Sequence, residues 1–318
     1  MNTIRHALWL WLLAVALGGC AATAPVKTDD FVAYHDAVES LSAGSAAALA
    51  YEREWTYRNY LASFTEGGAA NPAAVILDFP DGPGAPFAWT LSDAPQYIAI
   101  QDTEARLAEL NKLFSDYSSL LVELSGATAN DAGRITGLGE ALNKNSLSAA
   151  RALGMKPDAK PVALFSAAAT SAAQAYVNHR RRTSLQAVLR ANQPAVDAFA
   201  KLGADAARIS AVGIKTEYQN DTKRWVERYV KAAASKRGKL IEEQLALNER
   251  TIAQLDALRK IHDSYLLLAK KHAELANSVG TGGRVDFRRL IDNGQQLRDL
   301  YKRLRTAGEQ QLNAGDSP

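Results

Sequence analysis

Residues 252–279 have the sequence IAQLDALRKIHDSYLLLAKKHAELANSV, in which apolar residues recur at regular intervals. One side of this stretch recurs every three or four residues, at Ile252, Leu255, Leu258, Ile261, Tyr265, Leu268, His272, Leu275 and Val279. This spacing is typical of a heptad-like seam along one helix face. It predicts a helix from about residue 238 to about residue 279, about 60 Å long at 1.5 Å per residue. Gly280, Gly282 and Gly283 predict where it ends.

The flanking segments carry the same periodicity. A last helix is expected after the glycines, a first helix begins after Asp29 or Asp30, and a third stripe of apolar residues runs from Leu107 to Leu124. Pro194, preceded by Asn192, predicts the start of another helix, because proline is favoured in the first helical turn. We therefore expect an all-α fold over residues 31–313: an elongated antiparallel helical bundle of about five to seven long, coiled-coil-like helices. Residues 314–318 are expected to be a frayed tail.

Residues 66–96 interrupt this pattern with an irregular, proline- and glycine-rich insertion. Two strand-like segments, VILDF at 75–79 and FAWTL at 87–91, flank its turn-rich centre. They either pair as a hairpin or lie as an irregular loop against the bundle.

The N-terminus has the order of an export signal. A short segment with Arg5 precedes the apolar run ALWLWLLAVAL at residues 7–17, which is too short to cross a hydrocarbon core of about 30 Å. The tetrapeptide Leu17-Gly18-Gly19-Cys20 then resembles the lipobox of bacterial lipoproteins. The resemblance implies that residues 1–19 are removed and that Cys20 carries acyl chains that anchor the protein in a lipid bilayer. Residues 20–30 would form the lipidated end and a flexible tether, and Ala21 implies the outer membrane of a Gram-negative cell, on its periplasmic face.

Charge and motifs exclude several classes of function. The chain holds 37 Lys and Arg against 34 Asp and Glu, so nothing demands a nucleic-acid partner. None of the histidines that follow the signal (His35, His179, His262 and His272) has a second histidine one turn away, and no nucleophile motif is present. We therefore predict no metal site, no cofactor and no enzymatic activity. His272, on the seam, is expected to be a hydrogen-bonded core histidine.

Two groups of residues are candidates for contacts. Arg288, Arg298, Lys302 and Arg305 lie roughly along one side of the last helix and could touch an anionic surface near the membrane, or form a solvated face. The non-periodic aromatic residues are candidates for a partner or ligand site, or else are buried where the insertion folds over the bundle: Trp55, Phe79, Phe87 and Trp89.

These features favour a membrane-anchored envelope lipoprotein that acts as a non-enzymatic scaffold or adaptor for an envelope protein or cell-wall partner. The alternative is a binding module for a small or amphiphilic ligand held between helices. A closed core would favour the scaffold, and a pocket of several hundred Å³ lined by Trp55, Trp89 or their neighbours would favour the binding module. A third hypothesis is a hydrolase whose catalytic residues are dispersed in the sequence.

Overall fold

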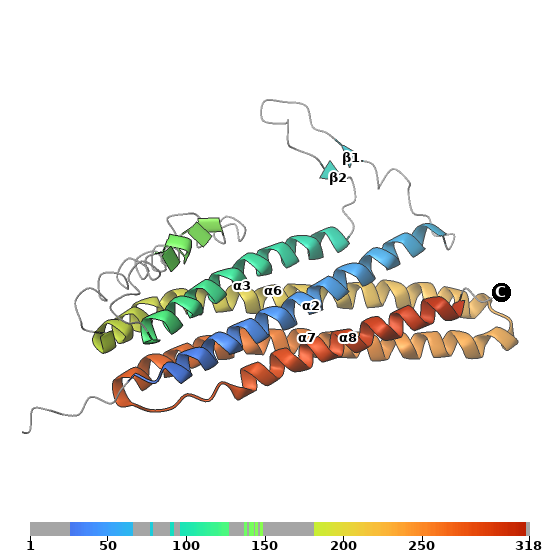
Figure 1. Ribbon diagram of the computed structural model, residues 1–318. Coiled ribbons are helices and arrows are strands. Elements are labelled where there is room, and N and C mark those ends of the chain that lie inside the picture. Colours follow the sequence, from blue (N-terminus) through green and yellow to red (C-terminus); the bar gives the residue numbers. More distant parts are fainter. Residues whose placement is uncertain are drawn as a thin grey trace, which may run out of the picture.

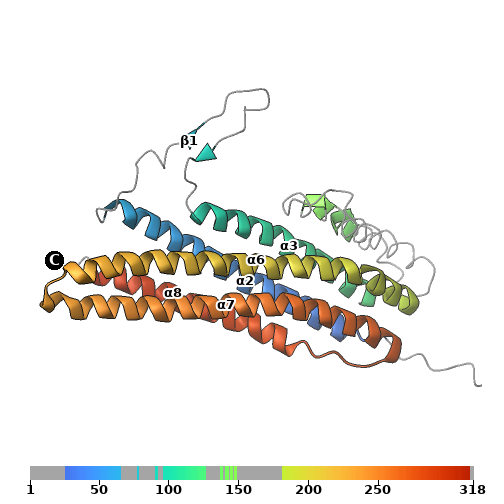
Figure 2. The ribbon, with the colours of Figure 1, turned by 180° about the vertical axis from the view of Figure 1, so that it is seen from behind.

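The computed structural model describes residues 26–65, 77–78, 90–91, 96–126, 137–138, 140–142, 144–145, 147–148 and 181–315. Five long helices account for most of them: α2 (Thr28–Thr65), α3 (Gln96–Gly126), α6 (Arg181–Lys231), α7 (Ala234–Thr281) and α8 (Arg288–Gly315). They lie side by side along one long axis, which confirms the elongated all-α helical bundle (Figures 1 and 2).

Helices that follow one another in the chain run in opposite directions, whereas α2 and α8 run parallel: Ser40 contacts Ile291 at one level, and Tyr51 contacts Tyr301 further along both helices. The α6–α7 pair forms a long antiparallel hairpin through residues 232–233. α2 packs on α3, α7 and α8, so it lies at the centre of the other layer. Hydrogen bonds at both ends fix its direction: Lys27 Nζ donates to the carbonyl of Gly282 at 2.7 Å, and Gln254 Nε2 donates to Glu52 Oε2 at 3.0 Å. Hence α2 begins at the end of the bundle where α7 ends.

The seam that predicts α7 is correct over most of its length. The helix ends at Thr281, two residues later than expected. Gly282 ends it, because this residue adopts φ 75° and its N–H donates to the carbonyl of Ser278 at 2.7 Å. Leu258 through Val279 follow the buried face, but Ile252 is 61 % exposed. The expectation that Ile252 belongs to the seam is therefore wrong; Thr251 and Gln254 take the buried positions at that level.

His272 is the core histidine that its place on the seam predicts. Its ring is fully buried, Nε2 lies 2.7 Å from the Tyr117 hydroxyl, and Nδ1 lies 2.7 Å from Gln193 Oε1. Burial lowers the pKa of the imidazole to about 3, so the ring is neutral. A neutral ring donates from Nδ1 to Gln193 and accepts the Tyr117 proton at Nε2, which satisfies both nitrogens.

The predicted helix start at Pro194 is wrong, because α6 runs without a break from Arg181 to Lys231 with Pro194 inside it. Pro194 is exposed, so the carbonyl that loses its hydrogen-bond partner lies on the solvent side of the helix. Asn192, expected as a cap, is instead buried and donates to the carbonyl of Val188 at 2.7 Å.

The hairpin alternative for the insertion is confirmed where the chain is described. β1 (Leu77–Asp78) pairs antiparallel with β2 (Thr90–Leu91), with Leu77 opposite Leu91 and Asp78 opposite Thr90. In Figure 1 the pair stands away from the bundle near the end of α2. Phe79, Phe87 and Trp89 lie outside the described residues.

At its ends the bundle differs slightly from the expected limits. α2 begins at Thr28, so the predicted tether at residues 20–30 loses its last three residues to the helix, and α8 extends to Gly315. Among the described residues, none of the helices combines the length and apolar character that spanning a membrane would require.

Candidate functional site

α2 and α8 approach each other most closely at two glycines. A Cβ atom on Gly294 would lie 2.3 Å from the carbonyl oxygen of Ser40, and one on Gly44 would lie 3.0 Å from the carbonyl oxygen of Gly294. The Ser40 hydroxyl also donates to the carbonyl of Ile291 at 2.9 Å. The two backbones therefore touch at this crossing, which only residues without a side chain permit.

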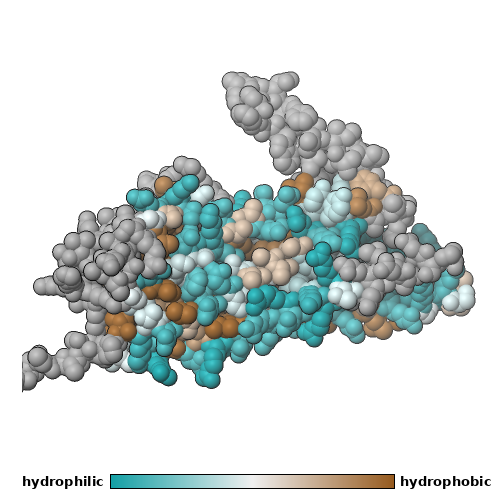
Figure 3. Space-filling view, in the orientation of Figure 1, coloured by the Kyte–Doolittle hydropathy of each residue, from teal (hydrophilic) through white to brown (hydrophobic). Residues whose placement is uncertain are grey.

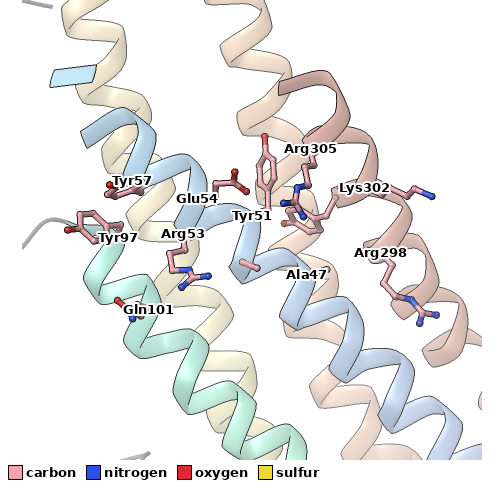
Figure 4. Close-up of a pocket in the computed structure, with 12 residues that line it drawn as sticks. Ala47, Tyr51, Arg53, Glu54, Tyr57, Tyr97, Gln101, Arg298, Lys302 and Arg305 are labelled. Atoms are coloured by element: carbon pink, nitrogen blue, oxygen red, sulfur yellow. The ribbon is translucent and has the colours of Figure 1, made fainter. Parts of the chain in front are cut away.

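Beyond the crossing, larger side chains separate the helices and leave a groove over α2, with α3 on one side and α8 on the other (Figure 4). Its volume is about 700 Å³. We call it the α2–α3–α8 groove; it is lined by Ala47, Ala50, Tyr51, Arg53, Glu54, Tyr57, Tyr97, Gln101, Arg298, Tyr301, Lys302 and Arg305. Figure 3 shows this face of the molecule as mainly hydrophilic, with several separate patches of apolar residues.

Aromatic pairs hold the two walls of the groove to its floor. Tyr51 of α2 meets Tyr301 of α8 with ring centroids 5.5 Å apart, and Tyr57 of α2 meets Tyr97 of α3 edge to face at 5.2 Å. Tyr301 is buried, whereas Tyr57 is 45 % exposed. The aromatic surface that a ligand can reach is therefore mainly on the α3 side of the groove, at Tyr57 and Tyr97, and it suits a ligand with an apolar or ring-containing part.

The charges of the groove are predominantly positive. Arg53 pairs with Glu104 at 3.1 Å, and Glu54 pairs with Arg58. Within the part of the chain that the structure describes, Arg298 and Lys302 have no carboxylate partner. In Figure 4, Arg305 points toward Tyr51, whereas Lys302 extends outward from α8. The α8 wall thus carries cations both beside the groove and at its rim.

The structure brings together three of the four basic residues that the sequence singled out on the last helix. Arg298, Lys302 and Arg305 all line the groove. Arg288 does not: it lies ten residues before Arg298, about 15 Å along the helix, and its guanidinium donates to both carboxylate oxygens of Asp286. This bond also holds the pKa of the exposed Asp286 carboxyl below its usual range.

Trp55, the described member of the predicted aromatic site, lines a second cavity of about 310 Å³ between α2, α6 and α7. The Arg250 guanidinium lies 3.8 Å from the centre of its ring, a cation–π contact. Trp225 lines the same cavity from α6. The sequence therefore identified one residue of this cavity but not the partner that lies over it.

Two carboxyl groups with unusual surroundings lie between α2, α6 and α7: Glu52 is buried and Glu217 is half-buried. Glu52 is 1 % exposed and Glu217 accepts a hydrogen bond from the Thr56 hydroxyl at 3.2 Å. Burial raises the pKa of Glu52 to about 8, with a further contribution from Glu217, and burial raises the pKa of Glu217 to about 7. Neither residue lines either cavity.

Several groove residues were missed by the sequence analysis. Arg53, Tyr97 and Gln101 face the groove only because α2 and α3 pair in one register. Ala47 and Ala50, two small residues beside the aromatic segment of α2, are the one local signal that could have located its floor.

Within residues 26–65, 96–126 and 181–315, no group of three or more His, Cys, Asp or Glu side chains is arranged to hold a metal ion. No family model, no curated protein and no solved structure matches this chain.

Proposed function

We propose that this protein is a lipid-anchored envelope lipoprotein that binds an anionic amphiphile in the α2–α3–α8 groove. The carrying observation is the groove itself: a cavity of about 700 Å³ that combines four basic side chains with four tyrosines. Arginine and tyrosine donate hydrogen bonds to phosphate, sulfate or carboxylate oxygens, and the tyrosine rings cover apolar groups. This is the binding-module alternative of the sequence analysis, and the size of the cavity supports it.

The expected lipid anchor would hold the groove at a defined distance from the membrane. Lys27 joins the start of α2 to the loop after α7 through its hydrogen bond to Gly282. The six residues from Cys20 to Pro25 therefore link the expected lipid to the bundle, which is described from Val26. Six extended residues reach about 20 Å, and the groove begins about 30 Å further along α2. We propose that the anchor is in the outer membrane and that the groove faces the periplasm.

Binding without chemical transformation is supported by the positions of the titratable groups. An acid–base catalyst needs a carboxyl with a shifted pKa within reach of the substrate. Glu52 on α2 and Glu217 on α6 have raised pKa values, but neither side chain lines either of the two cavities. Their contacts with Thr56 and Gln254 across helices suit a role in packing.

The test is titration calorimetry of the purified protein with dodecyl phosphate below its micelle concentration. We expect saturable binding near one molecule per chain, and much weaker binding of neutral dodecyl maltoside and of inorganic phosphate. The triple variant Arg298→Glu, Lys302→Glu, Arg305→Glu should weaken dodecyl phosphate binding at least about tenfold, since each charge-assisted contact contributes about 1.5–3 kcal/mol.

A matched variant, Arg190→Glu, Arg284→Glu, Arg289→Glu, changes the net charge equally but alters exposed residues that do not line the groove. It should bind like the unaltered protein at physiological salt, where screening limits distant charges. Equal binding of the neutral amphiphile, or equal losses in the two triple variants, would refute the proposed groove function.

The scaffold or adaptor is the second candidate, and one observation favours it. Three aliphatic side chains, Ile209 and Val212 on α6 and Ile252 on α7, are 57–61 % exposed to solvent. Polar residues are the usual choice at such exposed helix positions. A partner helix could cover these side chains. A photo-crosslinking residue at position 212 or 252 should then join one defined envelope protein in cells, and the same residue at the exposed position 190 should not.

A further inference from the structure

The turn between α6 and α7, which we call the tip and define as residues 222–240, is strongly cationic. It holds seven Lys and Arg residues and one acidic residue, Glu227. Arg224 pairs with Asp221, and Arg228 lies 3.4 Å from Glu243. In the described part of the chain the remaining five have no carboxylate partner: Lys223, Lys231, Lys236, Arg237 and Lys239.

Helix stability does not account for these charges. Lys231 at the end of α6 is favourable, because cations stabilise a helix C-terminus. Lys236, Arg237 and Lys239 stand in the first turns of α7, where the helix dipole disfavours cations and where acidic residues are the usual choice. The first turn of α7 contains no acidic residue, and Ala233 at its N-cap makes no side-chain cap. A local rule broken this way points to a function of the charges themselves.

Apolar and aromatic groups lie among the charges. Val226 is 46 % exposed and Val230 is 68 % exposed, and the turn itself consists of half-buried Ala232 and exposed Ala233. Cations around exposed aliphatic side chains are the composition of surfaces that bind the headgroup region of anionic membranes. A sugar or peptide polymer gains little from exposed valines, so the composition favours a bilayer.

The tip is also preformed. The Trp225 indole N–H donates to the carbonyl of Leu240 at 2.6 Å, joining the two helices. Trp225 stacks on Tyr229 with centroids 5.1 Å apart, and the Arg237 guanidinium lies 5.2 Å from the centre of the Tyr229 ring. The cations are therefore displayed on a rigid support, and binding needs little ordering of the chain.

The tip is at the end of the bundle opposite the start of α2. α7 connects the two ends over 48 residues, about 70 Å at 1.5 Å per residue. We propose that the tip binds the surface of an anionic phospholipid bilayer, so that a chain held at its N-terminus links two surfaces about 70 Å apart. This inference does not depend on what the α2–α3–α8 groove binds.

The experiment measures capture of one vesicle population by another. The full chain is reconstituted through its N-terminal segment into neutral phosphatidylcholine vesicles, and fluorescent acceptor vesicles are added. We expect capture of acceptors containing about 30 % phosphatidylglycerol, no capture of neutral acceptors, and loss of capture as salt shortens the Debye length. Any N-terminal anchor suffices for reconstitution, so failure here is separate from failure of the groove or of lipidation.

The tip variant Lys236→Glu, Arg237→Glu, Lys239→Glu should lower the apparent affinity for anionic acceptors at least about a hundredfold, because each cation near such a surface contributes about fivefold. Arg190→Glu, Lys201→Glu, Lys270→Glu is the matched control: it reverses three exposed residues far from the tip and should change capture less than about twofold. Circular dichroism checks that both variants keep their helices.

A neutral substitution separates a bilayer from a charged polymer. Val230→Ser should lower capture severalfold, because it removes the most exposed apolar group of the tip, whereas Val212→Ser on the side of α6 should not. Capture of neutral acceptors, equal losses in the two triple variants, or retention on isolated cell-wall polymer without capture of anionic vesicles would each overturn the proposal.

Discussion

Glu52 is a carboxyl group in a buried environment that disfavours its usual charged form. One carboxylate oxygen accepts from Gln254 Nε2 at 3.0 Å, and the other, Oε1, is buried and has no hydrogen-bond partner among the described residues. A charged carboxylate is costly in such a place, so burial favours the neutral acid and raises the pKa to about 8.

This raised pKa makes stability depend on pH. In the unfolded chain the Glu52 pKa is near its ordinary value of about 4.3. Between about pH 5 and about pH 8 the folded protein keeps a proton that the unfolded chain has released, so the free energy of unfolding falls as pH rises. The slope from one such carboxyl approaches 1.4 kcal/mol per pH unit, about one proton's worth.

Glu52→Gln removes the carboxyl group that binds a proton in the folded protein and releases it in the unfolded chain. We expect the free energy of unfolding, measured with urea at several pH values between about 5 and 8, to fall less steeply with pH in this variant than in the unaltered protein. Glu242→Gln, at an exposed position, is the control and should leave the slope unchanged. A slope that is the same in all three proteins would show that Glu52 is ionised when folded.

The sequence pattern predicts the burial of some polar residues but not of others. His272 could be assigned to the core because it occupies a position in an apolar seam. Glu52 stands beside Glu54 and Arg53 in a segment that looks like any charged helix face, and only the approach of Gln254, more than 200 residues later, buries it. Periodicity identifies a buried position where its neighbours are apolar, not where polar residues pair across helices.

At the scale of the elements, the α2–α8 crossing sets the shape of the groove. Gly294 allows the α8 backbone to touch the carbonyl of Ser40, and the tyrosines further along hold the helices apart. The crossing acts as a fixed point from which the two helices diverge.

Gly294→Ala should disrupt this crossing. Its Cβ would lie 2.3 Å from the Ser40 carbonyl oxygen, so α8 must move. We expect the free energy of unfolding to fall by about 1–3 kcal/mol, the usual cost of overpacking, and dodecyl phosphate binding to weaken because the α8 wall shifts.

The control is Gly238→Ala, where an added Cβ would meet no atom within 4 Å. This variant should be more stable by about 0.5–1 kcal/mol, since alanine favours a helix over glycine. Equal stability changes in the two variants, measured by urea unfolding, would mean that the α2–α8 contact is not close.

Helices were predicted more reliably than their limits. The α7 seam and its terminal glycines specify that helix locally, so its position follows from the residues within it. The predicted start of α6 at Pro194 was wrong, because a proline in the first turn of a helix and a proline on an exposed helix face can have the same neighbouring residues. Tertiary contacts of Asn192 and Ala195 with the core decide between them.

At the scale of the whole molecule, the chain is a rod with different chemistry at its two ends. The start of α2 is tied to the α7–α8 loop near the expected lipid anchor, and the cationic tip lies at the other end. The basic residues of the tip are visible in the sequence, but their grouping at one end follows only from the antiparallel pairing of α6 and α7. The groove is likewise a product of three helices and could not be read from one of them.

Lipidation is a property of the whole molecule because it sets where the rod is held. In Cys20→Ser the chain lacks the thiol that carries the acyl chains, so we expect it to be absent from the membrane fraction of cells. Ala22→Ser, two residues away, should stay in that fraction, and its intact mass should show a cleaved, acylated N-terminus. Membrane retention of Cys20→Ser would contradict the anchor.

Covalent mapping with a photoreactive amphiphile shows directly whether the α2–α3–α8 groove is a ligand site. Dodecyl phosphate carrying a diazirine at the end of its chain is photolysed with the full-length protein, and the labelled peptides are sequenced by mass spectrometry. We expect saturable labelling confined to peptides that contain Tyr51–Tyr57, Tyr97–Gln101 or Arg298–Arg305, competed by unlabelled dodecyl phosphate. Labelling that is spread over all helices, or that does not saturate, would contradict the proposed ligand site.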